Sequence, residues 1–102
     1  MPNLESYLLV SAALFSVGAF GFLARRNAIL MLISIELMLN AVNLSLIAFG
    51  AFLPGARGTS AIFAVMVMAV AAAEATVGLA LVIAIIRTRQ TPEVDEYSDL
   101  RE

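Results

Sequence analysis

Three long stretches with almost no charge constrain most strongly how this chain can fold. Residues 6–24 carry no charge, residues 27–56 carry only Glu36, and residues 58–86 carry only Glu74. A helix rises about 1.5 Å per residue, so about 20 residues cross a hydrocarbon core roughly 30 Å thick. Lipid offers the backbone no hydrogen-bond partner, so each stretch must be helical. We therefore predict an all-α integral membrane protein with three transmembrane helices.

The composition narrows the chemistry. Of the 102 residues, 62% are hydrophobic and 14% charged, whereas about a quarter of a soluble domain is charged. The absence of cysteine and histidine excludes disulfides, iron–sulfur ligation, Cys or His zinc sites and Ser-His or Cys-His catalysis. No glycine-rich phosphate loop and no basic aromatic stripe for nucleic acid is present. The sequence thus predicts a lipid bilayer as surroundings, with no metal site and no nucleic-acid partner.

The predicted boundaries follow from turn and cap residues. Asn27 can cap the second helix, residues 54–58 form a turn, and Thr59 or Ser60 can cap the third helix. The chain is predicted to be a single membrane domain over residues 1–102. Its helices are expected over about residues 4–24, 28–52 and 60–87, followed by an acidic tail over 88–102.

The arginines predict the orientation. Only Arg57 lies on one side of the predicted membrane, and the other five lie on the opposite side: Arg25, Arg26, Arg87, Arg89 and Arg101. Positive residues are in excess on the cytoplasmic side of membrane proteins. We therefore expect the N-terminus outside, and the first loop and the C-terminus in the cytoplasm.

The two acids in the second and third helices are the candidate functional residues. Glu36 lies ten residues after Arg26 and Glu74 thirteen before Arg87, which places them ~15 Å and ~20 Å from the cytoplasmic end, near mid-depth. An acid there costs about 2.5–3.5 kcal/mol on insertion scales, and no basic residue within the spans neutralises it. A carboxyl group held in low dielectric that takes up and releases protons suits a proton relay.

A polar face on the second helix supports this interpretation. Asn40 and Asn43 lie within about 40° of Glu36 around the helix, whereas Ser34 and Ser45 fall on the opposite side. A polar stripe in a membrane must face protein or internal water. The two asparagines could instead serve as hydrogen bonds between helices, worth about 0.6 kcal/mol each.

Small residues accompany the second acid. Ala71 and Gly78 lie near the face of Glu74, and they leave space for water or for a partner helix. The alanine run 71–73 is interpreted as a close-packing surface.

Two segments resemble a known family. Residues 25–45, RRNAILMLISIELMLNAVNLS, and residues 69–81, AVAAAEATVGLAL, are similar to the signature helices of NADH-quinone oxidoreductase subunit K. The mitochondrial counterpart of that family is NADH dehydrogenase subunit 4L. By position, Glu36 and Glu74 match the two acids of the family, and Arg25 and Arg26 match its cytoplasmic basic loop. Arg25 and Arg26 are therefore, like Asn40 and Asn43, supporting candidates for the proton-transfer site.

The resemblance implies a role in respiratory complex I, in the cell inner membrane. The family packs in the membrane arm beside other small hydrophobic subunits and an antiporter-like subunit, and its acids belong to the proton-translocation pathway coupled to quinone reduction. It carries no cofactor, because NADH, flavin, iron–sulfur clusters and quinone belong to other subunits. The isolated chain is therefore expected to have no oxidoreductase activity.

Two other functions stay open at this point. A subunit of a related multisubunit cation/proton antiporter generally lacks this pair of acids. A non-transporting assembly subunit would tolerate glutamine in place of both Glu36 and Glu74. An ATP synthase rotor subunit is disfavoured because it has two helices and one acid.

Overall fold

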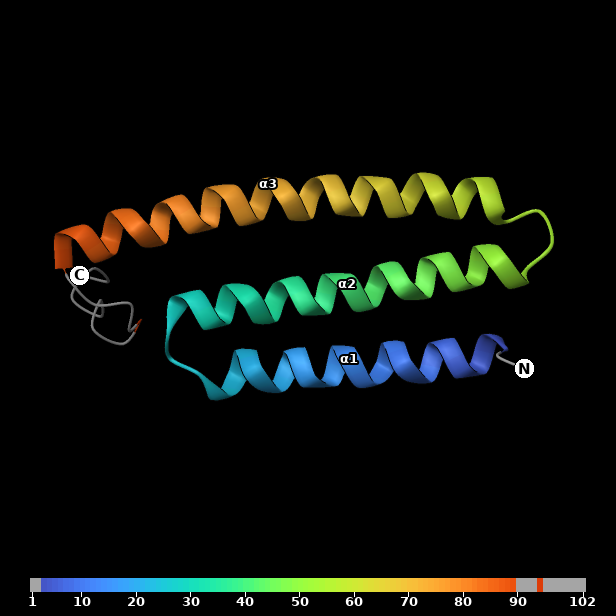
Figure 1. Ribbon diagram of the computed structural model, residues 1–102, viewed down its shortest axis with the longest axis horizontal. Helices are drawn as coiled ribbons and strands as arrows, with labels where there is room; N and C mark the ends of the chain where they lie inside the picture. Colours follow the sequence, from blue (N-terminus) through green and yellow to red (C-terminus); the bar gives the residue numbers. More distant parts are fainter. Residues whose placement is uncertain (1–2, 90–93, 95–102) are drawn as a thin grey trace, which may run out of the picture.

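The fold is a single layer of three helices. The computed structural model describes residues 3–89 and residue 94. Its helices are α1 (Leu4–Ala24), α2 (Ala28–Phe52) and α3 (Arg57–Arg89). Figure 1 shows them side by side, each antiparallel to the next, with α2 in the middle. The chain therefore begins at one end of the layer, and α3 finishes at the other.

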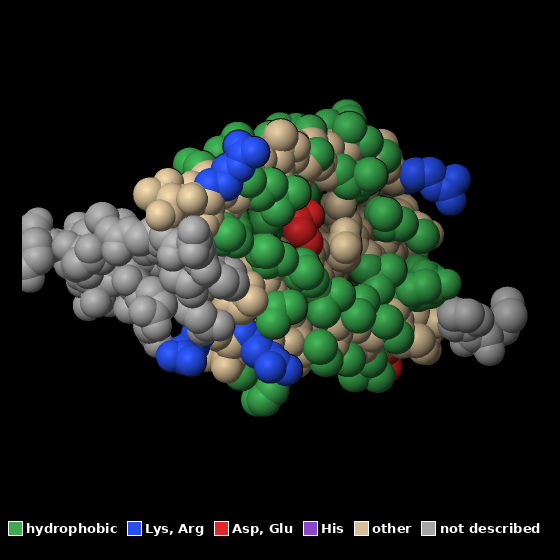
Figure 2. Space-filling view, turned by 60° about the vertical axis from the view of Figure 1, so that its left-hand side comes forward, with side chains coloured by type: hydrophobic (Ala, Val, Ile, Leu, Met, Phe, Trp, Pro, Cys, Tyr) green, Lys and Arg blue, Asp and Glu red, His purple; other side chains and the backbone are tan. Residues whose placement is uncertain are grey.

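Hydrophobic side chains cover the outside of this layer. All three helices are long and apolar enough to cross a membrane. Within the described residues no large side chain is fully buried, and many large hydrophobic ones are exposed, as the green surface in Figure 2 shows. Exposed apolar surface on this scale fits contact with lipid or with other membrane proteins. The predicted all-α architecture with three membrane-spanning helices is thus confirmed.

The starts of the first two helices follow from asparagine caps. The Oδ1 atom of Asn27 accepts hydrogen bonds from the backbone N–H groups of Ile29, at 2.9 Å, and Leu30, at 3.4 Å. This confirms Asn27 as the cap of α2. Asn3 caps α1 in the same way, accepting from the N–H of Ser6 at 2.9 Å. Each cap satisfies N–H groups that have no partner inside the helix.

The third helix differs from its prediction at both ends. It starts at Arg57 rather than at residue 60, so the expectation that Thr59 or Ser60 caps it is wrong. Gly55 turns the chain with a φ of 76°, and the carbonyl of Ala56 already accepts from the N–H of Ser60 at 2.9 Å. The turn is therefore complete three residues earlier than the Ser/Thr signal indicates.

At its other end α3 continues to Arg89, so residues 88 and 89, predicted as tail, are helical. The rest of the predicted acidic tail lies outside the described residues, apart from Val94. The N–H of Val94 donates a 2.9 Å hydrogen bond to the carbonyl of Arg26. The chain after α3 is thereby connected to the loop between α1 and α2.

Two glycines of α1 allow close packing against α2. A Cβ atom added at Gly18 would lie 2.6 Å from Met38 Cγ and 2.9 Å from the Ser34 carbonyl oxygen, and one at Gly21 would lie 2.7 Å from Ser34 Oγ. At Gly18 the close neighbours include the backbone of α2, so glycine is required there, whereas at Gly21 the close neighbour is the side chain of Ser34. The contact also fixes the rotation of α2, with Ser34 turned toward α1.

Candidate functional site

The register of α2 against α3 is defined by two contacts at opposite ends of their interface. Near one end Gly50 lies against Ser60, and near the other Gly78 lies against Leu32. The contacts are 18 residues apart on both helices, which is five full turns of about 3.6 residues. The interface therefore follows one straight face of each helix, with a constant antiparallel register.

This register places the two acids at the same level. Glu36 lies four residues after Leu32, and Glu74 lies four residues before Gly78. Because Leu32 and Gly78 are in contact and the helices are antiparallel, both acids are displaced by about 6 Å in the same direction along the layer. The structure thus brings the two predicted acids to the same depth.

The acids nevertheless lie on opposite sides of the layer. Glu36 is turned by about 40° from Leu32, and Glu74 by about 40° from Gly78. Because the helices are antiparallel, four residues forward on α2 and four residues back on α3 turn in the same sense. The two starting positions face each other, so this turn moves Glu36 to one side of the interface and Glu74 to the other. Figure 2 shows one acidic side chain in the middle of its face, surrounded by hydrophobic side chains.

Glu36 is partly enclosed between α2 and α3. Its residue is half-buried, and its Oε1 atom is buried with no hydrogen-bond partner among the described residues. On its side of α3 the neighbouring positions are Ala71 and Ala75, both only partly exposed. A buried polar atom without a partner costs about 1–3 kcal/mol, so this oxygen calls for a hydrogen bond from a water molecule or from a donor of another chain.

The two asparagines differ in their surroundings. Asn43 is 9% exposed, and its Oδ1 atom is likewise buried without a hydrogen-bond partner. It lies two turns beyond Glu36, about 10 Å along the same face. Asn40 is exposed and lies on the same side of the layer, further from α3. The predicted polar face of Glu36, Asn40 and Asn43 is thus present, and its edge nearest α3 is buried.

Glu74 lies outside the contact face of α3. The α3 residues with reduced exposure, spaced three and four apart, are Ser60, Ala64, Val67, Ala71, Ala75, Gly78, Val82 and Ile86. Glu74 is exposed and borders a shallow hollow on the surface with Ala73, Val77 and Gly78. Its side chain therefore lies on the exposed surface of α3, outside the face that contacts α2.

The basic loop is remote from both acids. Arg25 and Arg26 are exposed between α1 and α2, and Arg26 lies ten residues before Glu36, ~15 Å along the helix. The structure does not bring these predicted supporting residues to the carboxylates. They mark the end of the layer where the backbone of Val94 is attached.

The chemistry available at this site is that of isolated carboxylates. Within the described residues no group of three potential ligands could hold a metal ion, and Glu36 and Glu74 stand apart from each other. A single carboxyl group can take up a proton and release it. Sequence reasoning found these residues but missed the contact of Leu32 with Gly78, whose only signal is a glycine in an apolar helix.

Known proteins resemble this chain along nearly its whole length. Residues 6–102 match the family model of NADH-ubiquinone/plastoquinone oxidoreductase chain 4L. The chain is 57% identical over 96 residues to NADH-quinone oxidoreductase subunit 11 of Thermus thermophilus, covering 94% of this chain and 98% of that one. It is 54% identical over 104 residues to NADH-quinone oxidoreductase subunit K of Desulfitobacterium hafniense, covering 97% and 94%. It is also 48% identical over 98 residues to the organellar NAD(P)H-quinone oxidoreductase subunit 4L of Paulinella chromatophora, covering 96% and 95%.

Proposed function

Because this chain belongs to the NADH-quinone oxidoreductase subunit K family, also named chain 4L, we propose that its carboxylates carry protons in a translocation pathway coupled to quinone reduction. The resemblance predicted from its two helix motifs is confirmed. The chain is a subunit of NADH-quinone oxidoreductase and a multi-pass protein of the cell inner membrane.

The unpartnered oxygen of Glu36 is the observation that carries this proposal. Oε1 is buried beside α3 and receives no hydrogen bond from the described residues. An acid that only joined helices would be expected to have its partner inside the chain, as Ser11 does, whose hydroxyl on α1 donates to the carbonyl of Ala41 on α2. An oxygen left open near mid-depth suits a group that gains and loses a proton.

The two acids serve different neighbours in this proposal. Glu36 faces the α2–α3 interface, whereas Glu74 is exposed on the other side of the layer. Glu74 therefore meets a neighbouring membrane subunit of the complex. Small hydrophobic subunits and an antiporter-like subunit are the neighbours we propose.

This subunit is proposed to take no part in electron transfer. Its sequence has no cysteine or histidine, which are the common ligands of haem and iron–sulfur groups. NADH, flavin, iron–sulfur clusters and quinone then bind to other subunits, and the isolated chain does not oxidise NADH.

The excess of arginine at one end supports an orientation. Arg25 and Arg26 lie at the end of the layer where α3 finishes, and Arg57 lies at the other end. By the positive-inside rule, the N-terminus is outside and the first loop is cytoplasmic. Impermeant labelling of cysteines placed at Asn27 and Gly58 checks this, since only the latter should react in intact cells.

Substitution of each acid in the assembled complex tests the proposed function. Glu36→Gln keeps the shape of the side chain and removes its ability to carry a proton, so NADH-driven proton uptake by membrane vesicles should be nearly abolished. Glu74→Gln should reduce uptake less, because its exposed carboxylate can be replaced more easily by water or a neighbouring acid. Glu5→Gln, at the start of α1, is the matched control and should leave uptake unchanged.

The result also separates the alternatives. Wild-type uptake in a fully assembled Glu36→Gln complex would favour a non-transporting assembly role. Cation-dependent proton exchange without NADH or quinone, in the purified assembly, would favour the related antiporter.

A further inference from the structure

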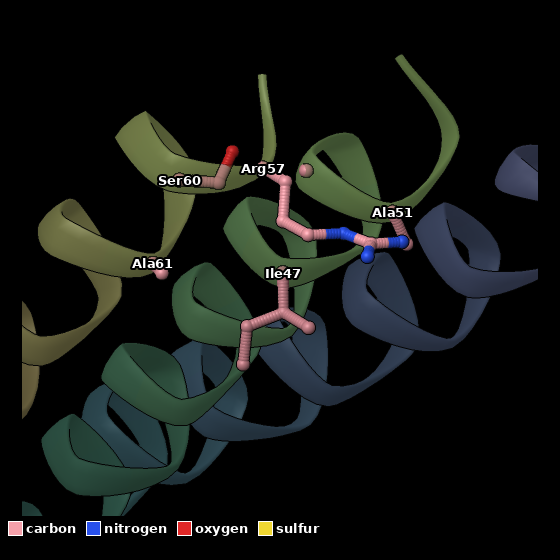
Figure 3. Close-up of a pocket in the computed structure, with 6 residues that line it drawn as sticks. Ile47, Ala51, Arg57, Ser60 and Ala61 are labelled. Atoms are coloured by element: carbon pink, nitrogen blue, oxygen red, sulfur yellow. The ribbon is translucent and has the colours of Figure 1, made fainter. Parts of the chain in front are cut away.

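A second polar feature lies at the end of the layer where α2 finishes and α3 begins. There the two helices leave a hollow of about 160 Å³, a volume close to that of an apolar cavity that takes up benzene. It is lined by Ile47, Gly50, Ala51, Arg57, Ser60 and Ala61 (Figure 3). None of these residues belongs to the proposed proton site.

The hollow exists because small residues meet at this end. Gly50 has no side chain, and Ser60 lies directly against it, so that an added Cβ at Gly50 would lie 2.6 Å from Ser60 Cβ. Ala51 and Ala61 leave the rest of the space open. The lining is therefore almost entirely apolar, apart from Arg57 and Ser60.

Anion-binding groups border this apolar space. Arg57 lies in the first turn of α3, and Figure 3 shows its side chain extending from α3 across the end of α2. The guanidinium group makes no ion pair or hydrogen bond with any residue that the structure describes. The N–H groups at the start of a helix also lack intrahelical partners and carry partial positive charge, so this turn attracts an anion.

Ser60 provides a second polar group at the hollow. The residue is 9% exposed, lines the hollow, and its hydroxyl makes no hydrogen bond to the described residues. The hydroxyl oxygen is not among the fully buried atoms, so a molecule that occupies the hollow can reach it and supply a hydrogen bond.

The position along the membrane identifies the class of that molecule. Arg57 is the first residue of α3, at the end of the spans where lipid headgroups are found, while Ile47 lies five residues inside the end of α2, about 7.5 Å toward the hydrocarbon core. A molecule that presents an anionic group to Arg57 and hydrocarbon to Ile47 is amphipathic. We propose that this hollow binds an anionic glycerophospholipid, with its phosphate on Arg57, Ser60 and the first turn of α3, and the start of an acyl chain on the apolar lining.

Retention of lipid by the purified complex tests this proposal. Arg57→Gln removes the charge, and Ala61→Phe fills the hollow without changing the charge. Both should lower the amount of tightly bound anionic phospholipid, measured by mass spectrometry after extensive detergent washing, by one molecule per complex. The affinity at this site should fall roughly tenfold in Arg57→Gln, as expected for a lost charge-assisted hydrogen bond.

Two control variants make the loss specific. Thr59→Ala changes an exposed neighbour that does not line the hollow, and Arg25→Gln removes a charge at the opposite end of the layer. Both should retain the lipid. Equal loss from Arg25→Gln, or unchanged lipid in both Arg57→Gln and Ala61→Phe, would overturn the proposal.

A photoreactive residue at Ala51 identifies the occupant directly. A cross-linked phospholipid supports the proposal, and its yield should fall in the Arg57→Gln background. A cross-link to another subunit would show that protein fills the hollow instead. Phosphate that stays bound after all phospholipid has been removed would indicate a free-phosphate site and would likewise contradict a lipid.

Discussion

The two faces of α2 differ in whether their buried polar groups are hydrogen-bonded. Toward α1, the hydroxyl of Ser11 donates to the carbonyl of Ala41 and contacts the hydroxyl of Ser45. Toward α3, Glu36 Oε1 and Asn43 Oδ1 are buried without any hydrogen bond in the described chain. The same helix thus has one satisfied interface and one that is left open.

This difference separates polar groups that hold the fold from those available for function. A satisfied serine pair contributes modestly to helix association, about 0.6 kcal/mol on average in membranes. Without a donor from outside the chain, the two buried oxygens would cost about 1–3 kcal/mol each. Such a cost is typical of functional sites.

Moving the acid from one side of the layer to the other should have the largest effect on proton uptake. Asn40 lies one turn from Glu36 on the same side, whereas Ile35 is its neighbour in sequence but about 100° away around the helix. In Glu36→Ala, the further change Asn40→Glu should restore part of the NADH-driven uptake, and Ile35→Glu should restore none. Uptake is normalised to assembled complex. Equal recovery from both positions would show that depth, rather than side, decides function.

Removing the second unpartnered oxygen should have an intermediate effect. Asn43→Leu replaces the buried amide by an apolar side chain of similar size, so water can no longer be held two turns from Glu36. Proton uptake should fall several-fold, less than in Glu36→Gln, with the complex still assembled. Ser45→Ala, which alters the satisfied face, should leave uptake per complex unchanged. The comparison of the two faces fails if Ser45→Ala lowers uptake as much as Asn43→Leu.

Alanine substitutions at glycines should have the smallest effects, and these should appear in stability alone. An added Cβ at Gly18 meets the Ser34 carbonyl at 2.9 Å, whereas one at Gly78 meets the flexible end of Leu32 at 3.1 Å. Gly18→Ala should therefore destabilise the complex by about 1–3 kcal/mol. Gly78→Ala should be near neutral, because its strain is offset by a gain in helix propensity of about 0.5–1 kcal/mol.

Thermal unfolding of the complex in detergent measures this pair. Gly58→Ala is the control, since nothing lies within 4 Å of its added Cβ. If Gly78→Ala proved as damaging as Gly18→Ala, the α2–α3 interface would be as tightly packed as the α1–α2 interface.

Features that depend on one helix at a time could be predicted from the sequence. The apolar stretches, the Asn27 cap and the polar face of Glu36 and Asn43 each follow from residue type and helical period. The start of α3 could not be predicted correctly. Its Ser/Thr signal was overridden by the turn at Gly55, directly after which the carbonyl of Ala56 accepts the first hydrogen bond of the helix.

Features that depend on two helices were beyond the sequence. The side of the layer on which Glu74 lies is set by the contact of Leu32 with Gly78, and no periodicity within one helix specifies that register. Glu36 Oε1 likewise has no partner because the nearest positions on α3 are alanines, and α2 alone does not reveal this. The acids themselves were recognisable, but their separation was not.

The order of contacts in this layer has a consequence for biosynthesis. The extensive contacts join α1 to α2 and α2 to α3, so each span packs on the one synthesised just before it. The α1–α2 hairpin can close its serine bonds and glycine contacts while α3 is still being translated. An insertion machinery that releases spans one by one would therefore not need to retain a helix until a later, non-adjacent span of this chain had been made. The outer surface of α3, emerging last, would then be the natural place for the nascent chain to join its neighbours.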